Sequence, residues 1–257
     1  MSLAITLEGK KGLVLGLANA HSIAFGCAEA FAAAGADLLL CYQDARTEAE
    51  ASAAAAQLGG FPAVACDVRE ENQLQTLFAQ AAERWGRLDF VLHSIAFAPR
   101  ADLHGRVVDC SREGFLKAMD ISCHSFLRVA KLAEPLMAEG GSLLTVSYMG
   151  SSEVVEHYGL MGPVKAALES ATRYMAAELG PKQIRVNALS PGPIPTRAAS
   201  GIASFDALLG HAVEKSALRR IVDLGDIGSF AAFLASDLGK NITGGVHVID
   251  AGYAIMD

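Results

Sequence analysis

Short apolar runs alternate along the chain with longer amphipathic stretches. Each run is bounded by Gly, Pro or Asp, and continuous apolar runs of this kind are typical of strands that are buried on both faces of a parallel sheet. The segments that we predict to be strands are 12–16, 37–42, 63–67, 89–94, 142–147, 185–189 and 246–250.

The stretches between the first of these runs have helical periodicity, and we predict helices at 22–34, 47–58 and 70–85. Gly35 and Gly59 follow two of them, at the position where many helices end in a left-handed residue. Alternating strands and helices require right-handed crossovers. The pattern therefore predicts an α/β fold with a doubly wound, Rossmann-type parallel sheet of about seven strands and helices on both faces.

We find no internal repeat and no linker rich in Ser or Pro, so we expect one domain over residues 1–257. The stretch 190–196 is irregular, because three prolines in five residues are incompatible with a helix or a central strand. We therefore predict a long loop near 191–209, and loops of that length are more often functional than incidental.

The composition narrows the classes of function. Of 257 residues, 52% are hydrophobic and 19% are charged, which excludes a disordered chain. The net charge of −7 argues against nucleic acid as a partner, and no apolar run is long enough to span a membrane. The five cysteines are scattered and odd in number, so we expect reduced thiols in a cytoplasmic protein. No pair of histidines has metal-ligand spacing, and we predict no metal site.

The stretch from Gly16 to Gly26 follows the first predicted strand and opens the first predicted helix. A helix N-terminus there would offer free N–H groups and a favourable dipole to a pyrophosphate. The glycine fingerprint is incomplete, because Ala20 and Ser22 stand where its second and third glycines would be. Ser22 can instead cap the helix, and Gly26 allows the helix to pack close to the sheet. An ordinary strand–helix turn is the alternative interpretation.

Three further positions lie at the carboxyl ends of predicted strands, along the crevice where such sheets bind ligands. Gln43 ends the second strand at the ribose-reading position, with Asp44 and Arg46 nearby and opposite in charge. Asp67 ends the third strand and could accept from an adenine amino group, or cap the next helix, or both. Residues 93–96 end the fourth strand, where backbone beside small residues can approach a cofactor.

The stretch Tyr158-Gly-Leu-Met-Gly-Pro-Val-Lys165 places six residues between a tyrosine and a lysine, whereas carbonyl reductases of this fold have three. Pro163 belongs in the first turn of a helix, which predicts that the helix begins within about four residues before it. Tyr158 then stands at the helix entrance, and Met161 occupies the ordinary tyrosine position. Tyr148 follows the fifth predicted strand and could line the same cavity.

One set of motifs runs in order over nearly the whole chain: Gly16…Ser22-Ile23-Ala24, Tyr42-Gln43, Asp67-Val68, His93-Ser94-Ile95-Ala96-Phe97-Ala98-Pro99, Ser147-Tyr148, Tyr158-x6-Lys165, Arg185-Val186-Asn187-Ala188 and Pro193-Ile194-x-Thr196. Together they resemble the bacterial enoyl-acyl-carrier-protein reductases, a divergent branch of the short-chain dehydrogenase/reductase family. The resemblance implies a cytoplasmic, homotetrameric enzyme of fatty-acid synthesis. It would use NADH to reduce the trans-2,3 double bond of an enoyl thioester carried by acyl carrier protein.

The resemblance also implies roles for individual residues. Tyr158 would stabilise the enolate formed when hydride reaches Cβ, Lys165 would hold the nicotinamide ribose, and Tyr148 would share the catalytic site. The expected cofactor-binding residues are Gly16, Ser22, Ile23, Gln43, Asp67, Val68, Ser94, Ile95, Lys165, Pro193, Ile194 and Thr196. The expected substrate-binding residues are Ala98, Tyr148, Tyr158, Met161, Ile202 and Phe205, the last two on a substrate lid formed by the loop near 191–209.

NADH is expected over NADPH, because no arginine adjoins Gln43 to neutralise a 2′-phosphate. The chain departs from its better-known relatives at 203–209, which carries Asp206 in place of the lysine or arginine that attracts an acidic carrier protein. Arg197, Arg219 and Arg220 could supply that attraction instead, or the carrier protein could dock weakly; the other interpretation of Arg219 and Arg220 is a solvated helix end.

Two other functions stay open: a short-chain carbonyl or alcohol oxidoreductase, which Met161 argues against, and a non-catalytic NAD-binding regulator, which the presence of Tyr158 and Lys165 argues against. Chain length and delivery by carrier protein or by coenzyme A are not distinguished by the sequence.

Overall fold

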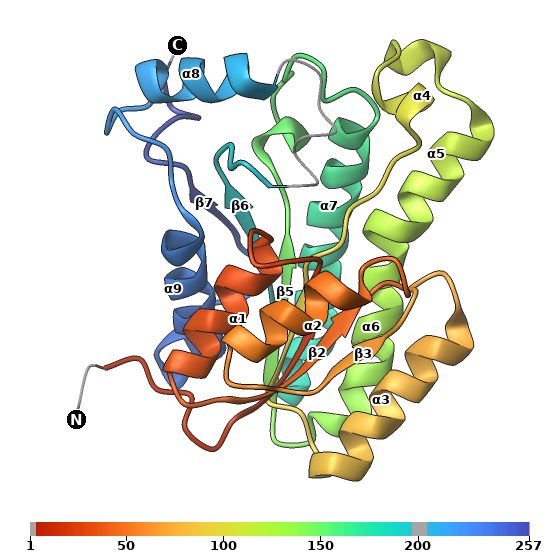
Figure 1. Cartoon of the computed structure of the whole chain (residues 1–257), viewed down its shortest axis with the longest axis vertical. Coiled ribbons are helices and arrows are strands. Elements are labelled where there is room, and N and C mark those ends of the chain that lie inside the picture. The colour runs from red at the N-terminus through yellow and green to blue at the C-terminus, as the bar shows by residue number, and fades with distance from the viewer. Residues whose placement is uncertain (1–3, 197–204, 257) are drawn as a thin grey trace.

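The computed structural model describes residues 4–196 and 205–256. Within them, seven strands form one sheet in the order β3-β2-β1-β4-β5-β6-β7, and every neighbouring pair is parallel (Figure 1). The strands are β1 (Lys11–Leu15), β2 (Asp37–Tyr42), β3 (Ala63–Ala65), β4 (Phe90–His93), β5 (Gly141–Val146), β6 (Ile184–Pro191) and β7 (Val246–Ile249). The doubly wound sheet predicted from the apolar runs is confirmed.

Helices cover both faces of this sheet (Figure 1). They are α1 (Ile23–Ala33), α2 (Glu48–Gln57), α3 (Glu71–Trp85), α4 (Arg100–Leu103), α5 (Arg112–Met119), α6 (Ser125–Ala133), α7 (Met161–Leu179), α8 (Phe205–Lys215) and α9 (Leu224–Ala235), with a π-helical segment, Asp120–His124, joining α5 to α6. The three helices predicted from the sequence are α1, α2 and α3, each within one residue of its predicted bounds.

Two apolar clusters hold the helices on the sheet. One packs buried side chains of α3, α5, α6 and α7 against one face, with Leu77 and Phe126 among its fully shielded members. The other packs α1, α2 and α9 against the opposite face, where the rings of Phe31 and Phe90 lie 4.6 Å apart. Because strands of the sheet are covered on both sides, they consist of continuous apolar runs rather than alternating ones.

The prediction that residues 190–196 all form a loop is wrong at its start, because Ser190 and Pro191 belong to β6 and pair with β7. Pro191 has no N–H to donate. The amides of Ala188 and Gly192 bond to the β7 side, so the nitrogen of Pro191 faces the β5 side, where pairing ends at Leu189. Its missing donor therefore interrupts no ladder bond. At the other end of the predicted loop, α8 begins at Phe205.

Gly26 serves a different contact from the one expected. A Cβ at this position would lie 2.6 Å from the Cβ of Leu224, and a Cβ on Gly228 would lie 2.3 Å from the carbonyl oxygen of Gly26. The missing side chains thus let α1 approach α9, the neighbouring helix, rather than the sheet (Figure 1). A helix–helix approach this close requires glycine on both surfaces.

The sheet reverses its winding between β1 and β4. The connection after β1 passes through α1 on one face, whereas the connection after β4 leads to α5 and α6 on the other. A crevice opens between two such connections beyond the carboxyl ends of the strands, and ligands of doubly wound sheets bind there. Most of the predicted cofactor-binding residues cluster at this end of the sheet.

The α1–α9 contact leads to a stability prediction. Gly228→Ala should lower the free energy of unfolding by about 2 kcal/mol, because the new methyl group overlaps the Gly26 carbonyl. Gly210→Ala, on α8, is the matched control, since its Cβ would meet nothing within 4 Å and a helical alanine is favoured over glycine by about 0.5–1 kcal/mol. Urea unfolding of both variants measures the difference; equal effects would contradict the packing argument.

Candidate active site

A cavity of about 450 Å³ lies along the carboxyl ends of β1 to β5. Of the residues expected to bind a cofactor, those on its wall are Gly16, Ser22, Ile23, Gln43, Asp67, Val68, Ser94, Ile95, Lys165 and Thr196. Pro193 and Ile194 are buried but are not on that wall, and Ile194 packs into the apolar cluster beneath α1 and α9. Segments up to 180 residues apart in the chain thus meet around one space.

The β1–α1 turn closes one end of the cavity. Gly16 has φ +98°, and a Cβ there would lie 2.1 Å from the carbonyl oxygen of Ser94, so the close approach of this turn to β4 requires glycine. Ser22 caps α1 as predicted: its Oγ accepts from the amide of Phe25 at 3.2 Å and donates to the carbonyl of Asn19 at 2.8 Å. The first turn of α1 carries no acidic residue. These features fit the phosphates of a dinucleotide.

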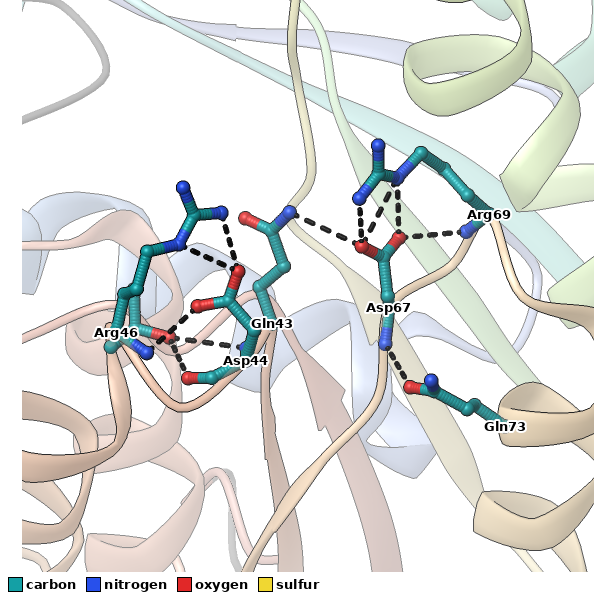
Figure 2. A network of polar contacts seen from close by, with 7 residues as sticks. Gln43, Asp44, Arg46, Asp67, Arg69 and Gln73 are labelled. Carbon is teal, nitrogen blue, oxygen red and sulfur yellow. Dashed lines mark hydrogen bonds and ion pairs between the residues drawn. The ribbon is translucent and has the colours of Figure 1, made fainter.

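Two aspartate–arginine pairs follow β2 and β3 (Figure 2), and Arg46, Asp67 and Arg69 of these pairs line the next part of the cavity. The carboxylate of Asp67 accepts from the guanidinium and the amide of Arg69 and, at 3.4 Å, from Nε2 of Gln43. Hydrogen bonds from Arg69 hold the pKa of Asp67 at about 2. Asp67 does not cap α3, because the N-cap position is Glu70; the carboxylate turns back to Arg69 instead. The capping interpretation of Asp67 is therefore wrong.

His93, the last residue of β4 and the first of the motif that runs to Pro99, is a core residue. It is fully buried, with Nε2 at 2.7 Å from Oγ of Ser125 and Nδ1 at 3.1 Å from Oγ1 of Thr145. Burial lowers its pKa to about 3, so the ring is neutral near pH 7. The residues that follow His93, namely Ser94, Ile95, Ala96 and Phe97, reach the cavity wall.

Lys165 enters the cavity from the first turns of α7. Its ammonium donates to the carbonyl of Val146 at 2.6 Å, and the side chain is buried. Burial lowers its pKa to about 8, while Cys123 and Glu169 act in the opposite direction. One turn later, Glu169 accepts from Oγ of Ser147 at 2.5 Å. Two side chains of α7 therefore bind two consecutive residues at the end of β5.

Tyr158 lies at the entrance to α7, as the position of Pro163 in the first helical turn predicted. Its side chain is 8% exposed, and its ring packs against that of Tyr148 with the centroids 4.8 Å apart. Burial raises the pKa of both phenols above the ordinary value, so both are hydrogen-bond donors at neutral pH. Among the described residues, the buried hydroxyl of Tyr148 has no hydrogen-bond partner. That phenol therefore has a hydrogen bond available for a ligand, although neither tyrosine is among the residues that line the cavity.

Two glycines shape the entrance around Tyr158. Gly159 has φ +48°, and a Cβ there would lie 2.5 Å from the carbonyl of Leu103. A Cβ on Gly150 would lie 2.5 Å from the ring of Tyr158. The turn before α7 therefore requires glycine at 159, because a side chain there would overlap the carbonyl of Leu103 and shift the turn that carries Tyr158.

The residues expected to bind substrate divide into two groups. Tyr148, Tyr158, Ala98 and Met161 belong to or pack against one apolar cluster, with Met161 5% exposed. Ile202 falls outside the described residues, and Phe205 is described only as the first residue of α8.

Sequence reasoning missed several residues of the cavity wall: Leu17, Arg69, Phe97, Lys117 and Ile121. Arg69 could have been found, because Asp67-Val-Arg69 repeats the Asp-x-Arg pattern of Asp44-Ala-Arg46. Lys117 and Ile121 could not, since α5 and the π-helical segment reach the cavity only through the packing of the connection after β4.

The family model described as enoyl-(acyl carrier protein) reductase matches residues 16–254 of the chain. The chain belongs to this family. The resemblance inferred from the ordered motifs is thereby confirmed, and the family match spans the β1–α1 turn, both tyrosines, Lys165 and the described part of the loop after β6.

Named relatives of this reductase family cover nearly the whole chain. An enoyl-acyl-carrier-protein reductase (NADH) of Rhizobium meliloti strain 1021 is 44% identical over 247 residues, which are 96% of this chain and 91% of the relative. The structure of the Anaplasma phagocytophilum reductase in complex with NAD has a TM-score of 0.93 and 46% identity, over 97% and 95% of the two chains. The Bacillus cereus reductase with NADP⁺ and indole naphthyridinone has a TM-score of 0.95 and 41% identity, over 98% of each chain.

None of the helices in the described part of the chain is long and apolar enough to cross a membrane.

The buried ammonium of Lys165 leads to a prediction on pH. Its pKa is about 8 when folded and 10.5 ordinarily, so between these values the unfolded chain carries a proton that the folded chain lacks. The contribution of Lys165 to the free energy of unfolding therefore rises with pH between these two pKa values. Relative to Lys165→Met, the wild type should gain about 2 kcal/mol between about pH 7.5 and about pH 9.5.

Urea unfolding at both pH values measures this difference. Lys240→Met, at an exposed lysine, is the control and should show no such trend. A wild-type-to-Lys165→Met difference that stays constant with pH would contradict a buried ammonium at this site.

Proposed function

We propose that this chain reduces the trans-2,3 double bond of enoyl thioesters with NADH, as an enoyl-acyl-carrier-protein reductase of fatty-acid synthesis. The match to the reductase family over residues 16–254 supports the reaction class. The observation that carries the mechanism is the packed pair of Tyr148 and Tyr158, next to the segment of β5 that Lys165 binds. The cavity wall runs from Val146 and Lys165 to the β1–α1 turn.

NADH, when bound, supplies a hydride to Cβ of the enoyl group. Negative charge then develops on the thioester oxygen, two bonds beyond the carbon next to the acceptor, rather than on an oxygen attached to the acceptor carbon. A hydrogen-bond donor for that oxygen has to be displaced from the position that serves carbonyl reduction. Tyr158 stands three residues before Met161, which occupies that ordinary position, and its raised pKa keeps the phenol protonated. We assign Tyr158 as the donor that stabilises the enolate.

Lys165 is assigned to the nicotinamide ribose hydroxyls. An ammonium bonded to a single carbonyl retains two donors, and its position on the cavity wall supports this assignment. Tyr148 is assigned a supporting role at the thioester, because its buried hydroxyl lacks a partner among the described residues. The remaining cofactor and substrate residues expected from the sequence stay predictions, Pro193, Ile194 and Ile202 among them.

We also propose a cytoplasmic homotetramer in which residues 1–257 form one domain. Large apolar side chains on α5, α6 and α7 support an interface between subunits: Phe115 is 38% exposed, Leu116 51%, Leu127 37% and Tyr174 71%. The substrate lid near 191–209 remains a prediction. Its predicted span overlaps the end of β6 at Pro191 and the start of α8 at Phe205.

An acidic carrier protein as the donor of substrate is supported by exposed Arg219 and Arg220, which follow α8. They lie beyond the helix, so the solvated-helix-end interpretation does not describe them. Arg219 also donates to the carbonyl of Glu214.

The choice of substrate tests the reaction class. With NADH, crotonyl thioesters should be reduced and acetoacetyl thioesters should not, because Tyr158 is displaced from the position that protonates an alkoxide. Oxidation of NADH followed by absorbance, with both thioesters in parallel, measures the two rates. Faster reduction of the acetoacetyl thioester would favour a carbonyl reductase. Binding of NADH with neither substrate reduced would favour a non-catalytic regulator.

Substitutions separate the two main roles. Tyr158→Phe should lower turnover on crotonyl thioesters about a hundredfold, because the lost hydrogen bond forms only as charge develops. Its dissociation constant for NADH should stay nearly unchanged. Lys165→Ala should weaken NADH binding as well, because it removes a contact to the cofactor.

Turnover and NADH titrations of Tyr158→Phe, Tyr148→Phe and Lys165→Ala decide between these assignments. If Tyr158→Phe kept full turnover while Tyr148→Phe abolished it, the enolate would be stabilised by the other tyrosine.

A further inference from the structure

Two Asp-x-Arg units flank Gln43 at neighbouring strand ends. Asp44-Ala-Arg46 follows β2, and Asp67-Val-Arg69 follows β3, which pairs with β2 in the sheet. Both arginines and Gln43 lie on the cavity wall. In doubly wound folds the end of the second strand faces the adenosine ribose, so an arginine there would ordinarily favour a 2′-phosphate.

Each guanidinium is already held by the carboxylate two residues before it (Figure 2). Nε and Nη2 of Arg46 donate to Oδ2 of Asp44 at 3.1 and 2.5 Å, and the Arg46 amide donates to Oδ1 at 2.9 Å. Nε of Arg69 donates to both oxygens of Asp67 at 3.0 Å, and Nη2 donates to Oδ2 at 2.5 Å. The forks that would bind a phosphate thus already bind carboxylates.

The charges of the two units cancel. Arg46 lowers the pKa of Asp44, and Arg69 lowers that of Asp67, so both carboxylates are ionised near pH 7. Their negative charges also act on each other, as do the two positive charges. A 2′-phosphate entering beside Gln43 would therefore meet a locally neutral cluster whose carboxylates repel it, whereas an uncharged 2′-hydroxyl meets no such penalty.

We propose that Asp44 and Asp67 determine the preference of this reductase for NADH, by holding Arg46 and Arg69 in ion pairs that a 2′-phosphate would have to break. The inference rests on the proposed NADH dependence and goes beyond it. The sequence argument attributed the preference to the lack of an arginine next to Gln43; two arginines line the cavity and are occupied.

The two pairs differ in how strongly they are held. The side chain of Arg46 is 81% exposed, and exposed ion pairs are weak, so Asp44 restrains its arginine loosely. The side chain of Asp67 is 11% exposed, which makes its pair with Arg69 harder to break. NADPH should therefore bind the wild type weakly rather than not at all, through partial release of Arg46.

The test measures binding of NADH and of NADPH to the full chain by cofactor fluorescence, without substrate. Asp44→Asn keeps the size of the side chain and removes its charge. It should lower the ratio of the NADPH to the NADH dissociation constant about tenfold, as a charge-assisted bond to phosphate becomes available. Asp67→Asn should move the ratio in the same direction, and added salt should reduce both effects.

Three controls make the result specific. Asp44→Glu, which keeps the charge, should leave the ratio close to that of the wild type. Arg46→Gln added to Asp44→Asn should abolish the gain, because the released guanidinium is its source. Asp109→Asn changes the net charge equally in the exposed Arg106–Asp109 pair, which is absent from the cavity wall, and should leave the ratio unchanged.

A ratio that neither Asp44→Asn nor Asp67→Asn moves would overturn the inference, as would a gain that survives Arg46→Gln or that Asp109→Asn reproduces. These results are independent of catalysis. A chain that binds NADH but reduces no enoyl thioester would refute the proposed reaction and leave the binding ratios to decide the inference. A chain that binds neither dinucleotide would refute both.

Discussion

The attachment of α7 to the end of β5 is the interaction on which the reacting end of the cavity depends. Lys165 and Glu169 lie one helical turn apart and bind consecutive residues, the carbonyl of Val146 and the hydroxyl of Ser147. Burying an ammonium is unfavourable, and the lowered pKa of Lys165 records that cost. The hydrogen bond to Val146 offsets part of it. Tyr148 is the next residue of the chain, so the same contacts that orient the lysine also position this tyrosine.

The backbone of the turn before α7 determines where the phenol of Tyr158 lies. Gly159 allows the chain to pass close to Leu103, and Gly150 leaves room for the ring of Tyr158. The phenol is thereby delivered from the helix entrance, while the ordinary tyrosine position holds Met161 within the apolar cluster. The proposed role of Tyr158 at the thioester oxygen thus depends on the backbone that these two glycines allow.

At the opposite end of the cavity, around Gln43, charged side chains are present but neutralise one another in pairs. The chain has a net charge of −7, yet the region around Gln43 combines two arginines with two aspartates. Because each arginine lies two residues after its partner, both pairs form within a single turn of backbone and need no distant support. Selectivity for a coenzyme can then be altered by one carboxylate without rebuilding the fold.

The sequence alone determined the seven strands, the first three helices, the cap at Ser22 and the helix start near Pro163, because these depend on apolar periodicity and on the chemistry of neighbouring residues. Tertiary structure decided the rest. Gly26 meets α9 rather than the sheet, and Pro191 stays in β6 because the strand beside it has ended. Each outcome is a matter of which distant or folded-back atom lies within a few ångströms, and local pattern carries no information on that distance.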